Sequence, residues 1–142
     1  MHRIRIYFLT FFLAFFFTTS AITKNSYFAE GEKLFNEKKY SKSKFKFEKD
    51  IVFNPKNEKS YLYLAKIFQL EENDEFEEKN LNTVILLNPK NEEAVYFLAL
   101  LKIKKSDYEK SKELIDRFKK VCKTFCEKEK ELKTKLESLQ PK

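Results

Sequence analysis

Two copies of one five-residue stretch, 34 positions apart, determine how this chain of 142 residues folds. Asn54-Pro55-Lys56-Asn57-Glu58 recurs as Asn88-Pro89-Lys90-Asn91-Glu92. Proline lacks a backbone N–H and disfavours the α conformation in the residue before it, so we expect a helix to end at each Asn-Pro pair. The second asparagine of each copy can cap a new helix, and a glutamate in the first turn suits its positive end. Each copy is therefore a helix stop followed by a helix start.

The residues between these stops show the spacing of helices. Apolar side chains recur three and four positions apart, which places them on one helix face. In the middle of the chain they are Tyr61, Leu64, Ala65 and Phe68, followed by Leu81, Val84 and Ile85. Each 34-residue unit thus holds two helices of about 12–14 residues. The polar turns inside the units are predicted near Lys38-Lys39, Glu72-Asn73 and Ser106-Asp107.

A helical hairpin that repeats every 34 residues with a proline near its end resembles the tetratricopeptide repeat family. With Pro55 at repeat position 32, the units cover 24–57, 58–91 and 92–123. The small residue that the family carries at position 8, where the two helices touch, is matched by Gly31, Ala65 and Ala99. Position 27 departs from the family's usual alanine, with Asp50, Val84 and Phe118. The resemblance implies an all-α fold of three tandem helix-turn-helix hairpins in a short right-handed superhelix.

The charged segment 124–142 is predicted to cap this array. Leu132, Leu136 and Leu139 have helical spacing and suit a helix that covers the last apolar face. Thr124-Phe125-Cys126-Glu127 has the form of a capping box, which favours a new helix starting there. One long helix over residues 107–139 is the alternative, because its apolar residues keep a near-heptad register.

The first 21 residues differ from the rest of the chain. Arg3 and Arg5 precede an apolar run from Ile6 to Phe17, and the small residues Thr19-Ser20-Ala21 follow. This order predicts a signal peptide over residues 1–21 and an exported, periplasmic protein. The alternative is an uncleaved anchor in the inner membrane. A helix of that apolar length spans about 18 Å, short of a hydrocarbon core of roughly 30 Å.

Composition excludes most kinds of catalytic site. Gly31 is the only glycine, so the chain contains neither a glycine-rich phosphate-binding loop nor the glycine motif that binds dinucleotides. His2 is the only histidine, which removes Ser-His-Asp, Cys-His and histidine-based metal sites. We therefore expect no enzyme activity, no cofactor and no metal. The net charge of +7 is spread among interleaved acids, so nucleic acid is not an expected partner.

Cys122 and Cys126 are the only thiols of the chain. In an exported protein they can form a disulfide that fastens the third hairpin to the capping helix. Residues four apart on a regular helix have Cα atoms about 6 Å apart, within the range of a disulfide. Two unpaired, buried thiols are the alternative.

The resemblance also implies a surface for binding other proteins. In the family the first helix of each unit lines a concave face. Large apolar side chains among charges on that face indicate a groove for a peptide or helix. The corresponding residues of this chain are Phe28, Glu32, Phe35, Lys59, Leu62, Lys66, Tyr96, Leu100 and Ile103. Packing between helices, or cover by residues 125–139, is the alternative for these side chains.

The expected function is therefore a non-catalytic interaction scaffold of the bacterial cell envelope. Its partner would be a protein or peptide, and the membrane would be contacted only through the N-terminal segment. The family's carboxylate clamp for chaperone peptides is absent, because Phe28 and Glu32 stand at its first two positions. If the N-terminal helix is retained, the alternative is a membrane-anchored assembly subunit of an envelope complex.

Overall fold

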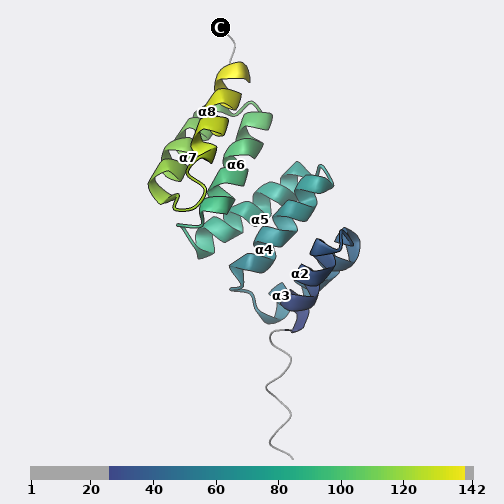
Figure 1. The fold of residues 1–142 in the computed structure, drawn as a ribbon. Coiled ribbons are helices and arrows are strands. Elements are labelled where there is room, and N and C mark those ends of the chain that lie inside the picture. The colour runs from purple at the N-terminus through teal and green to yellow at the C-terminus, as the bar shows by residue number, and fades with distance from the viewer. Residues whose placement is uncertain (1–25, 140–142) are drawn as a thin grey trace, which may run out of the picture.

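The structure is a computed structural model that describes residues 26–139. Three helical hairpins follow one another along the chain, and a last helix lies beside the third of them (Figure 1). This arrangement confirms the predicted all-α fold of paired helices. The helices of this part are α2 (Ser26–Asn36), α3 (Tyr40–Phe53), α4 (Glu58–Leu70), α5 (Asp74–Leu87), α6 (Glu92–Lys104), α7 (Tyr108–Val121) and α8 (Lys128–Leu139).

The predicted signal peptide over residues 1–21 lies outside the described residues. Within residues 26–139, no helix has the length and apolar character needed to cross a membrane.

The two Asn-Pro turns end and start helices as predicted, but their asparagines act differently. Asn91 caps α6, since its side chain accepts a hydrogen bond from the backbone N–H of Ala94 at 2.9 Å. Asn57 holds the same place before α4 and makes no capping bond. Its side-chain amide donates instead to the carboxylate of Asp50, at 2.6 Å.

Asp50 is the reason for this difference between the two copies. Its carboxylate is fully buried and accepts hydrogen bonds from Asn54 at 3.0 Å, Asn57 at 2.6 Å and Ser60 at 2.5 Å. A buried carboxylate requires such partners, because it has lost its contact with water. In the second unit the apolar Val84 stands at the equivalent position, so that turn has no buried acid to satisfy. Asp50, the residue that departs from the family pattern at repeat position 27, therefore joins the first two hairpins.

The turns inside the three hairpins share one backbone geometry. Lys38, Glu72 and Ser106 have φ angles of 58°, 54° and 59°, a left-handed region that usually holds glycine. In the second hairpin the N–H of Asn73 donates to the carbonyl of Phe68 at 2.9 Å. This is the Schellman ending of a helix, here completed without glycine.

Gly31 allows α2 and α3 to approach each other closely. A Cβ atom added at Gly31 would lie 2.8 Å from Cε1 of Phe47, whose ring is fully buried. The hydroxyl of Ser43 donates to the Gly31 carbonyl at 2.8 Å across the same contact. The equivalent Ala65 and Ala99 are also buried, as the helix contact at this repeat position requires.

The core consists of two clusters that meet at α4. The first joins α3 to α4 through Phe47, Leu64, Ile67 and Phe68. The second begins with Leu62 and Ala65 and continues through α5, α6 and α7 to Leu132 and Leu136 of α8. Because α4 contributes side chains to both clusters, it connects the first hairpin to the rest of the array.

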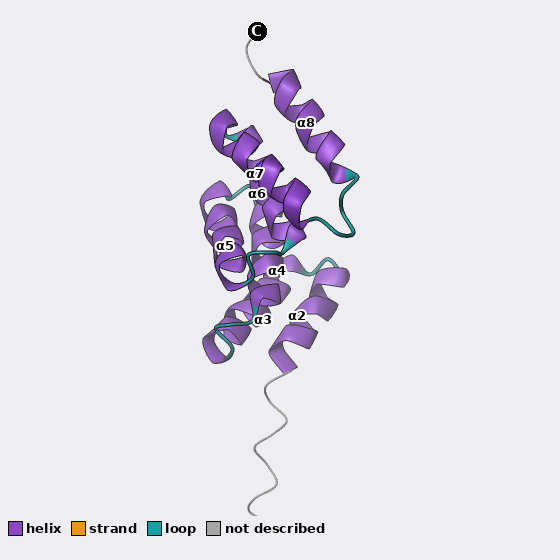
Figure 2. Ribbon diagram, turned by 90° about the vertical axis from the view of Figure 1, so that its left-hand side faces the viewer, coloured by secondary structure: helices purple, strands orange, loops and turns teal. Residues whose placement is uncertain are grey.

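Residues 107–139 form two helices, with a break between Val121 and Lys128. Figure 2 shows the loop that leads from α7 into α8. Within this loop the structure joins Cys122 to Cys126 in a disulfide, with Cα atoms 5.2 Å apart. The predicted capping box is wrong: the helix begins only at Lys128, and the Thr124 hydroxyl donates to Glu92 of α6.

Candidate partner-binding face

The first helices of the hairpins, α2, α4 and α6, lie in sequence along one face of the molecule, and α8 adjoins α6. We call this surface the α2–α4–α6 face. Polar contacts run across it from helix to helix. Tyr63 donates to Glu32 at 2.8 Å, Lys66 pairs with Glu93 at 2.6 Å, and Tyr96 donates to Glu131 at 3.0 Å.

Aromatic side chains occupy the part of this face between α2 and α4. Phe28 and Phe35 are partly exposed, and each meets the ring of Tyr63 edge-on, with centroids 5.9 and 5.0 Å apart. Beneath them Phe47 stacks on the same ring at 4.8 Å. Burial raises the pKa of Tyr63 to about 12, and its hydrogen bond to Glu32 contributes, so Tyr63 remains a neutral donor.

Tyr63 was not among the residues predicted to form the groove. The aromatic residue Phe97 stands at the same place in the next unit, and this recurrence is the sequence signal that could have identified it. The side chain of Lys66 lies between the two rings, with its ammonium 5.2 Å from the Tyr63 centroid and 5.9 Å from that of Phe97.

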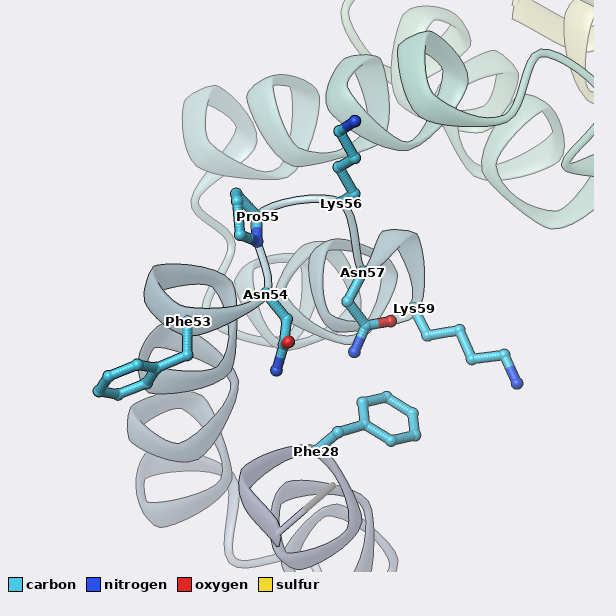
Figure 3. A pocket seen from close by; sticks show the side chains of 7 residues that line it. All are labelled: Phe28, Phe53, Asn54, Pro55, Lys56, Asn57 and Lys59. Atoms are coloured by element: carbon cyan, nitrogen blue, oxygen red, sulfur yellow. The ribbon is translucent and has the colours of Figure 1, made fainter. Parts of the chain in front are cut away.

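A pocket of about 630 Å³ opens at the end of this face where α2 and α4 begin. In Figure 3 the side chains of Asn54 and Asn57 point toward Phe28, while Lys59 extends past the edge of the Phe28 ring. Phe28 and Lys59 are two of the predicted groove residues, and the structure brings them together here. The complete lining consists of Phe28, Phe53, Asn54, Pro55, Lys56, Asn57 and Lys59.

A second cavity, of about 530 Å³, lies at the opposite end of the face, between α4, α5, α6 and α8. The predicted Leu100 and Ile103 line it together with Glu77 of α5. Burial, and then the nearby Asp74, raise the pKa of Glu77 to about 7. Gln69 donates a hydrogen bond to the same carboxyl at 3.2 Å.

Three of the predicted groove residues are buried, which corrects the predicted extent of the groove. The exposed fractions of Leu62, Tyr96 and Ile103 are 8%, 6% and 2%. Tyr96 is covered by the last part of the chain: its ring lies 6.5 Å from that of Phe125, and its hydroxyl donates to Glu131. Cover by residues 125–139, the alternative left open by the sequence, therefore applies to the α6 part of the face.

The remaining predicted residues keep some exposure on the face. Glu32 and Lys66 are engaged in the contacts between helices, as described above, whereas Lys59 is exposed. Accessible groove residues are thus concentrated toward α2 and the start of α4, with Leu100 separate from them at the second cavity. They are Phe28, Glu32, Phe35, Lys59, Lys66 and Leu100.

The loop that covers Tyr96 is held by Glu92, the last residue of the second Asn-Pro motif. Its carboxylate accepts the backbone N–H groups of Lys123, Thr124 and Phe125, and the hydroxyl of Thr124 as well. Burial acts to raise the pKa of Glu92, but these hydrogen bonds outweigh it and lower the pKa to about 2. The sequence predicted only that Glu92 opens a helix, because its partners lie more than thirty residues away.

The described part of the chain contains no group of three or more His, Cys, Asp and Glu side chains that could hold a metal ion. No family model and no curated protein sequence matches this chain.

Comparison with solved structures identifies the fold. The TPR2B domain of yeast Sti1, in its pHsp70 complex, superposes with a TM-score of 0.77 at 14% identity, over 84% of this chain and 100% of that domain. The first TPR of Spaghetti (RPAP3), bound to the HSP90 peptide SRMEEVD, gives a TM-score of 0.74 at 17% identity, over 87% and 98% of the two chains.

A bacterial protein has a similar structure as well. The Yersinia enterocolitica type III secretion chaperone SycD, in complex with a peptide of the translocator YopD, gives a TM-score of 0.74 at 13% identity, over 86% and 95% of the two chains. At these low sequence identities, the structural similarity establishes only the fold. The chain therefore has the fold of tetratricopeptide repeat domains.

Proposed function

We propose that this chain is a non-catalytic interaction scaffold that binds a peptide or helix of a partner protein on the α2–α4 part of the α2–α4–α6 face. The observation that carries the proposal is the partly exposed pair Phe28 and Phe35, which lies over Tyr63 and beside an open pocket. Aromatic anchors of this kind supply most of the binding energy in many interfaces.

Two further points support this assignment. Solved structures with the same fold contain bound peptides, among them those of Spaghetti and SycD, and the Sti1 domain is in a pHsp70 complex. In this chain the α6 part of the face is already covered by α8, which leaves the α2–α4 part for a partner. The interaction therefore concentrates on the first two hairpins.

Site-specific photo-crosslinking tests the proposal. A benzoyl-phenylalanine at position 35 would lie on the proposed face. The same group at Leu86, an 81% exposed residue of α5, provides the matched control. We expect a discrete crosslinked partner from position 35 only. Once that partner is purified, Phe35→Ala should weaken its binding about tenfold and Leu86→Ala should leave it unchanged. Crosslinks from position 86 but not from position 35 would place the interaction elsewhere.

We also propose that the protein is exported to the periplasm after removal of residues 1–21. The order of the N-terminal sequence supports export. The disulfide between Cys122 and Cys126 agrees with an oxidising compartment. The mature protein should begin at Ile22, and its thiols should react with an alkylating agent only after reduction. A protein that retains its N-terminus and sediments with membranes would instead favour the anchored assembly subunit.

A further inference from the structure

We infer that the pocket at the first Asn-Pro turn binds an acidic peptide segment that carries an apolar anchor side chain. This pocket is lined by Phe28, Phe53, residues 54–57 and Lys59. The inference rests on the proposed function, because it assigns a ligand chemistry to one end of the same face.

The apolar component of the site comes from two phenylalanine rings. Phe28 is held from behind by Phe47 and Tyr63, with centroids 5.8 and 5.9 Å away. Phe53, at the end of α3, is 64% exposed, and its ring stacks on Tyr27 at 5.7 Å. An apolar side chain bound in the pocket would remove aromatic surface from water, which is a favourable change.

The amide NH₂ groups of the two lining asparagines and the carbonyl of Pro55 already have partners within the chain. The side-chain amides of Asn54 and Asn57 donate to Asp50, as described above. The carbonyl of Pro55 accepts the hydroxyl of Tyr61 at 3.2 Å. The pocket therefore selects its ligand through its apolar surface and its charges.

Both charges of the lining are positive and lack a counter-ion. Neither Lys56 nor Lys59 forms an ion pair with any residue among 26–139, whereas the nearby Lys44 and Lys46 are paired with Glu71 and Glu30. Figure 3 shows the ammonium of Lys59 extending beyond Phe28, and that of Lys56 on the opposite side of the turn. A ligand carboxylate next to an anchor bound at Phe28 would complement Lys59.

The second Asn-Pro turn provides an internal comparison. There Glu93 stands in the place of Lys59 and pairs with Lys66 at 2.6 Å. Leu62 replaces Phe28 and is only 8% exposed. The guanidinium of Arg117 donates to the Pro89 carbonyl at 2.9 Å. At the second turn the same five residues are thus followed by a filled surface whose acid is already paired, so the open pocket with an unpaired lysine is specific to the first turn.

NMR titration of the ¹⁵N-labelled protein tests the inference with three acetylated hexapeptide amides. The probe is Asp-Asp-Phe-Leu-Asp-Asp. Its controls are the peptide with lysine in place of every aspartate, and the peptide with alanine in place of the phenylalanine and leucine. We expect the probe alone to shift the amide signals of Phe28, Phe53, Asn54 and residues 56–59. Lys59→Glu should weaken its binding about tenfold, whereas Lys90→Glu, at the equivalent turn, should not change it.

Several results would overturn the inference. The lysine peptide could bind equally well, the signals around residues 53–59 could fail to respond, or Lys90→Glu could have the same effect as Lys59→Glu. Vesicles that contain phosphatidylglycerol form a separate arm, and a response of these signals to the vesicles but not to the peptide would mean a lipid-binding site. If the acidic probe fails while crosslinking at position 35 persists, the ligand chemistry is wrong and the proposed function stands.

Discussion

Glu92, in the first turn of α6, accepts hydrogen bonds from both the backbone N–H and the hydroxyl of Thr124, in the loop that leads to α8. The N–H groups of Lys123 and Phe125 point at the same carboxylate. These donors lie inside the ring that the Cys122–Cys126 disulfide closes. The third hairpin thus holds the start of its own cap through one acidic side chain.

This contact predicts a specific loss of stability in acid. The pKa of Glu92 falls from its ordinary value of 4.5 to about 2 in the folded protein. The carboxylate therefore stabilises the fold fully above pH 4.5, and the contribution is lost as the pH falls toward 2. Melting temperatures should show that Glu92→Gln destabilises the protein at neutral pH and has a much smaller effect near pH 2.

Glu58 supplies the matched control, because it ends the first copy of the motif. It accepts a hydrogen bond from Asn88 at 2.9 Å and contacts no disulfide loop. We expect Glu58→Gln to have a smaller effect at neutral pH than Glu92→Gln. Equal effects of the two substitutions across the pH range would show that the loop contact adds nothing.

Gly31→Ala should destabilise the protein, although alanine is normally the better helix former. The new methyl group would lie 2.8 Å from the buried Phe47 ring, which is itself stacked on Tyr63 and has little room to move. We expect a loss of about 1–3 kcal/mol in the free energy of unfolding, measured with urea. Phe47→Leu in the same chain should recover part of that loss. A stabilising Gly31→Ala would mean that the two helices can separate without cost.

The sequence predicted the hairpins because their determinants are local. Pro55 and Pro89 stop helices wherever they stand, and the apolar period shows which side of each helix is buried. The role of Asp50 was harder to predict. Its departure from the repeat pattern is visible in the sequence, but its hydrogen bonds to Asn57 and Ser60 require the two hairpins to be placed against each other.

The site was predicted less completely, because its extent depends on contacts between distant parts of the chain. Nothing close to Tyr96 in the sequence reveals that Glu131 will accept its hydroxyl, thirty-five residues later. The position of α8 depends in turn on Glu92 and the loop. The aromatic half of the face, by contrast, lies on α2 and α4, and the repeat register was sufficient to select Phe28 and Phe35.

Glu72→Gly should stabilise the second hairpin. Glu72 has a φ of 54°, a conformation that costs a residue with a side chain about 1–2 kcal/mol relative to glycine. The greater freedom of glycine in the unfolded chain cancels part of this gain, so we expect a net increase of about 0.5–1 kcal/mol in unfolding free energy. Glu72→Ala removes the same side chain and keeps the backbone restriction, so it should give no such increase. If alanine and glycine stabilise equally, the effect comes from charge.

The raised pKa of Glu77 predicts a pH dependence of stability opposite to that expected from Glu92. Its pKa is raised from 4.5 to about 7 by burial and by Asp74, so the folded state holds a proton that the unfolded state has lost. Stability should therefore decrease as the pH rises from 4.5 through 7. Glu77→Gln keeps the shape and removes this titration. We expect it to raise the melting temperature above pH 7 and to change it little near pH 4.5. An effect of the same size at both pH values would contradict the raised pKa of Glu77.

Substitutions of Tyr96 test whether α8 covers the α6 part of the face or leaves an open groove there. Its ring packs on Phe118 and Phe125, and its hydroxyl donates to Glu131, so it connects α6 to the cap. In urea unfolding, Tyr96→Phe should lose one hydrogen bond, about 0.5–1.5 kcal/mol, and Tyr96→Ala about 3–5 kcal/mol. Binding of a partner identified at position 35 should be unchanged in Tyr96→Phe. If Tyr96→Ala instead leaves stability intact and abolishes that binding, α8 is displaced when the partner binds, and the groove extends over α6.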